Sequence, residues 1–199
     1  MSNNLVRKGY DKVASNYAAC RNQFKSIKYL KQFSKHVKQG KTILDVGCGA
    51  GKPVDKFLVK QGYVVNGIDL SSSMIELARK NVPEAFYKVK DMLELKDNEY
   101  CVEGIVSFYA IFHTPREKHQ KILNKFSSFM PNGGILLITM GYDTWEGINN
   151  DFHGAKMFWS HYGAEKNRKL VENAGFAVLL DEIDNSGGEK HQIILAKLD

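Results

Sequence analysis

The sequence predicts a doubly wound α/β fold, in which helices cover both faces of a mostly parallel sheet. Short apolar stretches rich in β-branched residues alternate along the chain with amphipathic stretches of helical length. The apolar stretches have few polar interruptions, which is typical of parallel strands buried on both faces. Crossover connections between such strands are right-handed in nearly all proteins, and this rule completes the doubly wound arrangement.

Length and composition favour a single globular domain over residues 1–199. Hydrophobic residues make up 43% of the chain, which is enough for a core of ordinary size. The start of the chain lacks the apolar region of a secretory signal, and no stretch approaches about 18 consecutive apolar residues, so we expect no membrane span. The three cysteines are far apart and form no CxxC pair, which favours the cytoplasm and argues against a disulfide framework or a metal site.

The central part of the chain predicts five strands and three helices. The strands are expected at 41–47, 63–69, 85–91, 103–110 and 135–141. The helices are expected at 52–62, 71–81 and 114–130. Beyond them, a helix at 165–175 precedes two strands, 176–184 and 190–198, which flank the turn sequence NSGGE. That turn predicts a hairpin, so the last two strands should be antiparallel to each other.

Local signals predict where several of these helices begin and end. Gly62 and Gly175 follow the last periodic residues, where glycine commonly caps a helix. An S-x-x-E capping box begins at Ser73. Thr114 comes directly before Pro115 and is expected to be the N-cap of the helix at 114–130.

The N-terminal region is strongly basic. Residues 1–41 hold ten Lys or Arg and one acid, Asp11, in a chain whose net charge is +6. Within this region, apolar residues recur at roughly helical spacing at Phe24, Ile27, Leu30, Phe33 and Val37. This pattern predicts a helix with its apolar face on the core and its lysines in water. A footprint for RNA or another anionic partner is the alternative, although no nucleic-acid motif accompanies it.

The stretch ILDVGCGAGKPV, residues 43–54, predicts a ligand-binding loop. Gly47, Gly49 and Gly51 follow the first strand, at the edge where open α/β sheets bind ligands. A dinucleotide loop has the spacing G-x-G-x-x-G, and a phosphate loop needs Gly-Lys followed by Ser or Thr, so both fit poorly here. A carboxylate just before the loop, Asp45, suits a ligand with a cationic amine.

The motif DVGCGAG resembles motif I of the class I S-adenosylmethionine-dependent methyltransferases. Further matches follow in order: the acid that ends the second strand, KDM after the third, SFYAIFH after the fourth, and MPNGG before the fifth. The N-terminal YDKVASNYAA also resembles a helix that many small-molecule members fold over the cofactor. The resemblance covers about residues 10–198. Glu103 departs from the family's usual Asp, and Asn132 from the more usual residue of its turn.

The resemblance implies a Rossmann-like sheet of seven strands with an antiparallel last strand, and it implies S-adenosylmethionine as the cofactor. Asp69 would accept the ribose hydroxyls, and Asp91 and Met92 would contact the adenine. The alternative role for Asp69 is that of a helix cap. The cofactor site expected on this basis comprises Tyr17, Asp45, Gly47, Cys48, Gly49, Asp69, Leu70, Met74, Asp91, Met92, Ser107 and Phe108.

Three residues are candidates for contact with the methyl acceptor: His113, Tyr109 and His161. His113 precedes a helix and Tyr109 ends a strand, so capping and core packing are the alternatives. The aromatic-rich segment 141–163 is expected either to pack on the core or to form a wall or lid of the acceptor pocket. By the resemblance, the N-terminal helical region, residues 1–40, would be a lid, with Tyr10 and Tyr17 over the methionine end of the cofactor.

These observations predict methyl transfer from S-adenosylmethionine to oxygen or nitrogen of a small molecule, by in-line displacement, with S-adenosylhomocysteine as the product. Two alternatives keep the cofactor: an enzyme that methylates RNA or protein through the basic N-terminal helix, and a binding protein without turnover. A nicotinamide oxidoreductase shares the fold class but needs a different glycine spacing. The charge distribution argues against a nucleic-acid partner without excluding one, and the sequence leaves monomer and homodimer open.

Overall fold

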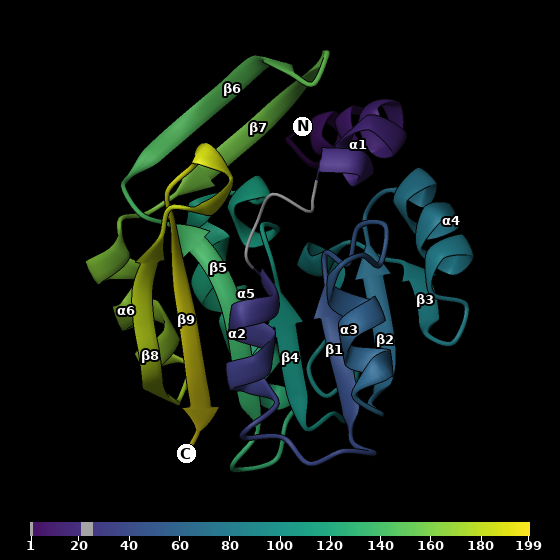
Figure 1. Cartoon of the computed structure of the whole chain (residues 1–199). Coiled ribbons are helices and arrows are strands. Elements are labelled where there is room, and N and C mark those ends of the chain that lie inside the picture. Colours follow the sequence, from purple (N-terminus) through teal and green to yellow (C-terminus); the bar gives the residue numbers. More distant parts are fainter. Residues whose placement is uncertain (1, 21–25) are drawn as a thin grey trace.

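The computed structural model describes residues 2–20 and 26–199, and a seven-stranded sheet forms its centre (Figure 1). The strand order is β3-β2-β1-β4-β5-β9-β8, and β9 is antiparallel to both of its neighbours while the remaining pairs are parallel. The bounds are β1 Thr42–Val46, β2 Val64–Asp69, β3 Phe86–Val89, β4 Gly104–Ser107, β5 Ile135–Gly141, β8 Phe176–Asp184 and β9 His191–Leu198. The predicted doubly wound fold with an antiparallel C-terminal hairpin is confirmed.

Helices cover both faces of this sheet. The α-helices are α1 Ser2–Cys20, α2 Ser26–Phe33, α3 Val54–Lys60, α4 Ser72–Asn81, α5 His119–Ser128 and α6 Ala164–Asn173. Short 3₁₀ turns are η2 Met92–Glu94, η3 Ile111–His113, η4 Arg116–Lys118 and η5 Ser186–Gly188. Apolar side chains of α2 and α3 pack on one face of the sheet, and those of α5 and α6 pack on the other. Helix α4 packs against β2 and β3.

The amphipathic pattern near the N-terminus forms α2 as predicted. Leu30 and Phe33 are completely buried, whereas Lys28 and Lys31 are exposed. Val37 is buried beyond the end of the helix. Phe24, which was expected on the same apolar face, lies outside the described residues. The lysine face therefore lies in water, and the Nζ atom of Lys28 pairs with Glu182 at 2.6 Å.

Two predicted helix starts are wrong. The N-cap of α4 is Ser71, whose Oγ accepts a hydrogen bond from the backbone N–H of Met74 at 3.2 Å. Ser73 lies inside the helix, and its N–H donates to Asp11 of α1. The hydroxyl of Thr114 donates to the carbonyl of Ile111 at 2.6 Å, so it ends a 3₁₀ turn instead of capping α5. The predicted helix ends at glycine are confirmed: Gly62 and Gly175 each come after a helix, and each has a positive φ.

The aromatic-rich segment forms a second, two-stranded antiparallel sheet of β6 Trp145–Phe152 and β7 Ala155–His161. Figure 1 shows this hairpin and α1 side by side beyond the carboxyl ends of the central strands, and α1 packs on β7. Among the described residues, no helix has both the length and the apolar character needed to cross a membrane.

Candidate functional site

A cavity of about 910 Å³, including its open mouth, lies between the carboxyl ends of the strands and α1. The loops after β1, β2, β3 and β4 form its floor, and α1 contributes Asn3, Val6, Tyr10, Tyr17 and Ala18. Because these loops follow four neighbouring strands, residues far apart in the sequence meet here. Thirteen residues of the predicted site line the cavity: Tyr17, Asp45, Gly47, Cys48, Gly49, Asp69, Leu70, Met74, Asp91, Met92, Phe108, Tyr109 and His113.

The glycine-rich loop after β1 needs its glycines because the backbone has positive φ there and because a neighbouring segment approaches it closely. Gly47, Gly49 and Gly51 have φ of +80°, +53° and +75°, where side chains with a Cβ are strained. A Cβ on Gly47 would lie 2.3 Å from the Cβ of Ala110, in the segment after β4. The glycine at 47 therefore lets the two floor segments of the cavity touch.

Asp69, the last residue of β2, is fixed by backbone amides. Its two oxygens accept hydrogen bonds from the N–H groups of Gly49 and Ser71, each at 2.9 Å. Burial raises the pKa of the Asp69 carboxyl to about 6, although these backbone hydrogen bonds oppose the rise. A carboxylate can accept about four hydrogen bonds, so Asp69 can still accept hydroxyl groups of a ligand in the cavity.

Asp91, just beyond β3, is held in a similar way. One of its oxygens accepts from the backbone N–H of Leu93 at 2.9 Å. The other accepts from the side-chain amide of Asn3 at 2.6 Å, so the first turn of α1 closes over this part of the cavity. The Asn3 amide already provides the kind of N–H donor that an exocyclic amine of adenine would provide.

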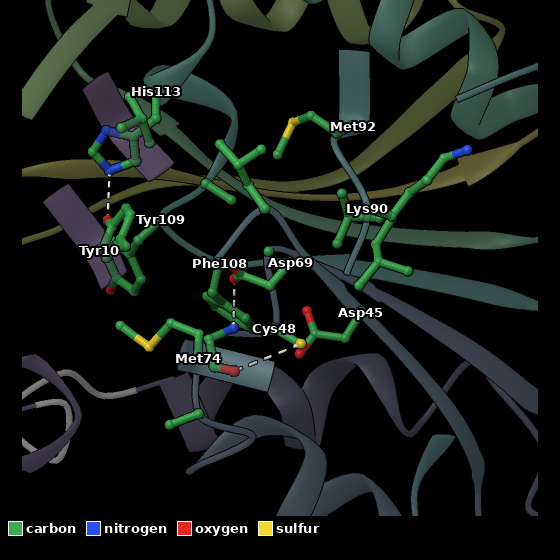
Figure 2. Close-up of a pocket in the computed structure, with 18 of the residues that line it drawn as sticks. Tyr10, Asp45, Cys48, Asp69, Met74, Lys90, Met92, Phe108, Tyr109 and His113 are labelled. Carbon is green, nitrogen blue, oxygen red and sulfur yellow. Dashed lines mark hydrogen bonds between the residues drawn. The ribbon is translucent and has the colours of Figure 1, made fainter. Parts of the chain in front are cut away.

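His113 is held in one orientation by two hydrogen bonds, of which Figure 2 shows the one to Tyr10. Its Nδ1 lies 2.8 Å from the carbonyl oxygen of Phe158 on β7, and its Nε2 lies 2.7 Å from the hydroxyl of Tyr10 on α1. Because a carbonyl oxygen only accepts, Nδ1 carries the proton. Burial lowers the pKa of His113 to about 4, so the ring is neutral and Nε2 accepts from the Tyr10 hydroxyl.

Tyr109 and Phe108 lie at the end of β4 on the floor of the cavity. Tyr109 is buried and has φ of +57°, a conformation that is strained for an aromatic residue. Its ring packs edge-on against His191 of β9 at a centroid distance of 4.8 Å. Tyr109 thus lines the cavity floor in a strained backbone conformation.

Two residues of the predicted site do not line the cavity. Ser107 is completely buried within β4, and its hydroxyl donates to the carbonyl of Val46 on the neighbouring strand at 2.9 Å. His161, at the end of β7, donates from Nδ1 to the carbonyl of Asp143 at 2.7 Å. Its ring covers Gly141, where an added Cβ would lie 2.2 Å from Nδ1.

The segment 141–163 packs on α1 and on His113, which both line the cavity. None of its residues is among the lining, because α1 lies between the hairpin and the cavity. The Phe152 ring packs on Tyr10 and Tyr17, and the Trp159 ring lies 4.3 Å from that of His113. The hairpin thus packs on α1 and His113, and none of its residues lines this cavity, so its role as a wall of the acceptor pocket stays a prediction.

The contacts of α1 were missed by the sequence analysis. Asp11 accepts from the hydroxyl of Ser71 at 2.6 Å, and Tyr10 binds His113. The tyrosine motif of the N-terminal region had indicated a cover for the cofactor, but it gave no partner for Tyr10. Asn3 carried no signal at all, since nothing near it in the sequence points to Asp91.

The pH dependence of stability tests the titration of these buried groups. Asp69 keeps its proton in the folded protein between pH 3.8 and about 6, so it stabilises the fold in acid and loses that contribution as the pH rises through about 6. His113 acts in the opposite sense: its contribution is present above pH 6.5 and is lost as the pH falls toward about 4. Between these limits the two effects largely offset each other.

Asp69→Ala removes the contribution of Asp69 to the pH dependence of stability and leaves that of His113. We expect the free energy of unfolding of the variant to fall more steeply than that of the wild type from pH 6 to pH 4, by ~1 kcal/mol per pH unit. Urea denaturation of both proteins at pH 4, 5 and 6 measures this difference. Parallel pH profiles would contradict the raised pKa of Asp69.

The known proteins that are similar in sequence to this chain include methyltransferases. Residues 43–134 match the sequence model of the methyltransferase domain. The chain is 39% identical over 87 residues to a putative methyltransferase, 235L, of Invertebrate iridescent virus 6, covering 39% of this chain and 32% of that protein. It is 28% identical over 118 residues to a ubiquinone biosynthesis O-methyltransferase of Coxiella burnetii, covering 57% of this chain and 49% of that protein. The chain thus spans half or less of the length of these relatives.

Similarity in structure extends over almost the whole chain. A magnesium protoporphyrin IX methyltransferase from Synechocystis, whose crystal structure contains S-adenosylmethionine, superposes with a TM-score of 0.67 at 16% identity, covering 96% of this chain and 84% of that one. At this identity the likeness establishes the fold. Residues 43–134 thus match a methyltransferase domain, and the chain as a whole has the fold of the class I S-adenosylmethionine-dependent methyltransferases.

Proposed function

We propose that this protein transfers the methyl group of S-adenosylmethionine to an oxygen or nitrogen of a small molecule. The observation that carries the proposal is the neutral, oriented His113 in the wall of a cavity whose floor is the glycine-rich loop of the methyltransferase domain. The sulfonium donor is already activated. The protein therefore has to position the two reactants, exclude water and accept a proton where the acceptor must lose one.

The lining residues fit the cofactor. Asp69 would accept the ribose hydroxyls, and Asp91, now bonded to an amide N–H, would accept the adenine amine. The positive φ of Gly47 and Gly49 brings bare backbone to the cavity beside Asp45, whose carboxyl suits the methionine amine. When bound, the cofactor supplies the electrophilic methyl group.

His113 is the residue that we assign to proton removal. The Tyr10 hydroxyl occupies Nε2 in this structure, and an O–H or N–H group of the acceptor can donate to the same nitrogen in its place. Nδ1 donates to the carbonyl of Phe158 throughout, so the ring presents its lone pair to the acceptor. The tyrosine therefore marks where the reacting group of the acceptor lies.

The charges around the cavity favour a neutral acceptor over a carboxylate. The two lysines of the lining are already engaged: Lys52 donates to Asn81 at 2.8 Å, and Lys90 pairs with Glu99 at 3.0 Å. In Figure 2, Lys90 lies on the opposite side of the cavity from His113. Methylation of a neutral O–H or N–H group is the chemistry that a neutral imidazole serves.

Methylation of RNA or protein is less well supported. The basic N-terminal region loses part of its charge to internal ion pairs, since Lys28 binds Glu182 and Lys41 binds Glu103. Helix α1 also covers the cavity that such an acceptor would have to reach. A small molecule needs a smaller opening, which is consistent with the proposed acceptor class.

Isothermal titration calorimetry tests the cofactor. We expect S-adenosylmethionine and S-adenosylhomocysteine to bind with roughly micromolar affinity and NAD not to bind. Asp69→Ala should weaken binding at least about tenfold, because charge-assisted hydrogen bonds to the ribose are lost. Asp97→Ala is the matched control, since that acid is exposed and pairs with Lys125 away from the cavity.

The outcomes separate the candidate functions. A folded protein that binds neither sulfur nucleotide would contradict the proposal. Tight binding without methylated product across a panel of phenols, alcohols and amines would instead indicate a binding protein without turnover. Activity on RNA that falls steeply with added salt would favour the nucleic-acid alternative.

A further inference from the structure

The structure contains a second hollow, a groove of about 430 Å³ including its open mouth. It lies between the segment after β3 and the helical stretch that η4 and α5 form in succession. Four apolar side chains line it, and the charged side chains in its lining are all lysines: Met92, Leu93, Leu95, Ile122, Lys118, Lys121 and Lys125. Apart from Met92, none of these residues belongs to the cofactor site or touches His113.

The groove adjoins the cavity at two places. Met92 lines both hollows, so they are neighbours at this residue. Across from it, His113 and Thr114 line the cavity, and the chain reaches Lys118 of the groove only four residues after Thr114. The groove therefore begins near the part of the cavity that holds His113, the residue that we assign to proton removal from the acceptor.

The floor of the groove is apolar. Leu95 and Ile122 belong to the core cluster on the α5 side of the sheet and are almost completely buried. Met92 and Leu93 pack on the same cluster and remain partly exposed. A hydrocarbon or aromatic portion of a ligand would leave water by lying on these side chains, which favours its binding.

The rim of the groove is positively charged. Lys118, Lys121 and Lys125 recur at spacings of three and four residues, which places them on one side of the helical stretch. Lys125 pairs with Asp97. Within the described part of the chain, the exposed side chains of Lys118 and Lys121 have neither an ion pair nor a hydrogen bond. Their two ammonium groups are therefore available to an anionic group above the apolar floor.

We propose that this groove binds the far end of the methyl acceptor, which is then an elongated molecule with an apolar middle and an anionic group, such as a carboxylate or a phosphate, at that end. This inference rests on the proposed function and narrows its acceptor class. The reacting O–H or N–H group beside His113 stays neutral, in agreement with the charges inside the cavity. The negative charge of the acceptor lies outside the cavity, beside Lys118 and Lys121.

The test measures binding to the protein loaded with S-adenosylhomocysteine. The probes are ω-(4-hydroxyphenyl)alkanoates with chains of four, six and eight carbons, each paired with its methyl ester. The phenol suits His113, and the other end is either charged or neutral. We expect the carboxylate of the best-fitting length to bind about three- to tenfold more tightly than its ester, because it gains ion pairs with the lysines. Added salt should reduce this preference.

The double variant Lys118→Gln/Lys121→Gln locates the effect. It should bind the carboxylate and the ester equally, with unchanged affinity for S-adenosylhomocysteine and for the esters. The matched control is Lys31→Gln/Lys38→Gln, which removes the same charge from two exposed lysines on and just after α2, on the other face of the sheet. This control should keep the preference of the wild type.

Methyl NMR of the same complexes, with labelled methionine and isoleucine methyl groups, shows where the probe lies. Met92 and Ile122 should both shift on binding. Wild-type protein that binds no member of the series, or that binds carboxylate and ester equally, would overturn the inference. So would a preference that survives in Lys118→Gln/Lys121→Gln or is lost in the control variant, or a shift of Ile122 without one of Met92. Protein that does not bind S-adenosylhomocysteine at all would instead overturn the proposed function itself.

Discussion

Replacing His113 by Gln is expected to lower kcat/KM for an acceptor that must lose a proton by about 10²- to 10⁴-fold, the usual contribution of a general base. Glutamine is similar in size and can still bond Tyr10, but it cannot accept a proton at neutral pH. The affinity for S-adenosylhomocysteine should stay within about twofold, because the proposed contact of His113 is with the acceptor and not with the cofactor. Steady-state kinetics and calorimetry on the same preparations measure both quantities.

Tyr10→Phe is the matched control for this change. It removes the hydroxyl that occupies Nε2 of His113 but keeps the ring that packs on Tyr17 and Phe152. If the hydroxyl only holds the place of the acceptor, kcat in this variant should remain within about tenfold of the wild type. Full activity of His113→Gln would remove His113 from the mechanism. A loss in Tyr10→Phe as large as that in His113→Gln would show that the two residues act as one unit.

The second large effect is expected for Gly47→Ala. A Cβ at this position would lie 2.3 Å from the Cβ of Ala110, and φ of +80° is itself unfavourable for alanine. Overpacking and backbone strain together should reduce the free energy of unfolding by about 2–5 kcal/mol. Because the floor segments after β1 and β4 must then separate, cofactor binding should fall as well. Urea denaturation and calorimetry check the two effects.

Gly49→Ala separates the cost of a positive φ from the cost of a steric clash. Its φ of +53° is also positive, but an added Cβ would meet no atom within 4 Å. This variant should lose only about 1–2 kcal/mol, the cost of the left-handed conformation. Equal destabilisation by the two substitutions would show that the close contact with Ala110 is not what requires glycine at 47.

The sequence predicted those features that depend on local pattern. The sheet followed from buried apolar stretches, and the glycine-rich loop that lines the cavity followed from three glycines after a strand, because both signals lie within a few residues. Ser71 shows the limit of such signals. Three consecutive serines, residues 71–73, offer three similar caps, and the choice depends on Asp11, which lies 60 residues earlier in the chain.

The parts of the site that escaped prediction depend on distant contacts. His113 was a candidate, but its orientation depends on Tyr10 and on Phe158, which are 103 and 45 positions away. His161 and Trp159 lie two residues apart on β7 and so share one face of that strand. Position along the strand separates them, which composition does not reveal: the ring of His161 covers Gly141, while Trp159 supports His113.

Helix α1 has a consequence for the energetics of binding. Through Asn3 and Tyr10 it supplies internal hydrogen-bond donors to Asp91 and His113, the groups that adenine and acceptor would use. A ligand entering this conformation therefore exchanges partners with the helix and gains few hydrogen bonds overall. The measured enthalpy would understate the strength of each contact with the ligand. The affinity would depend equally on where the displaced asparagine and tyrosine find new partners.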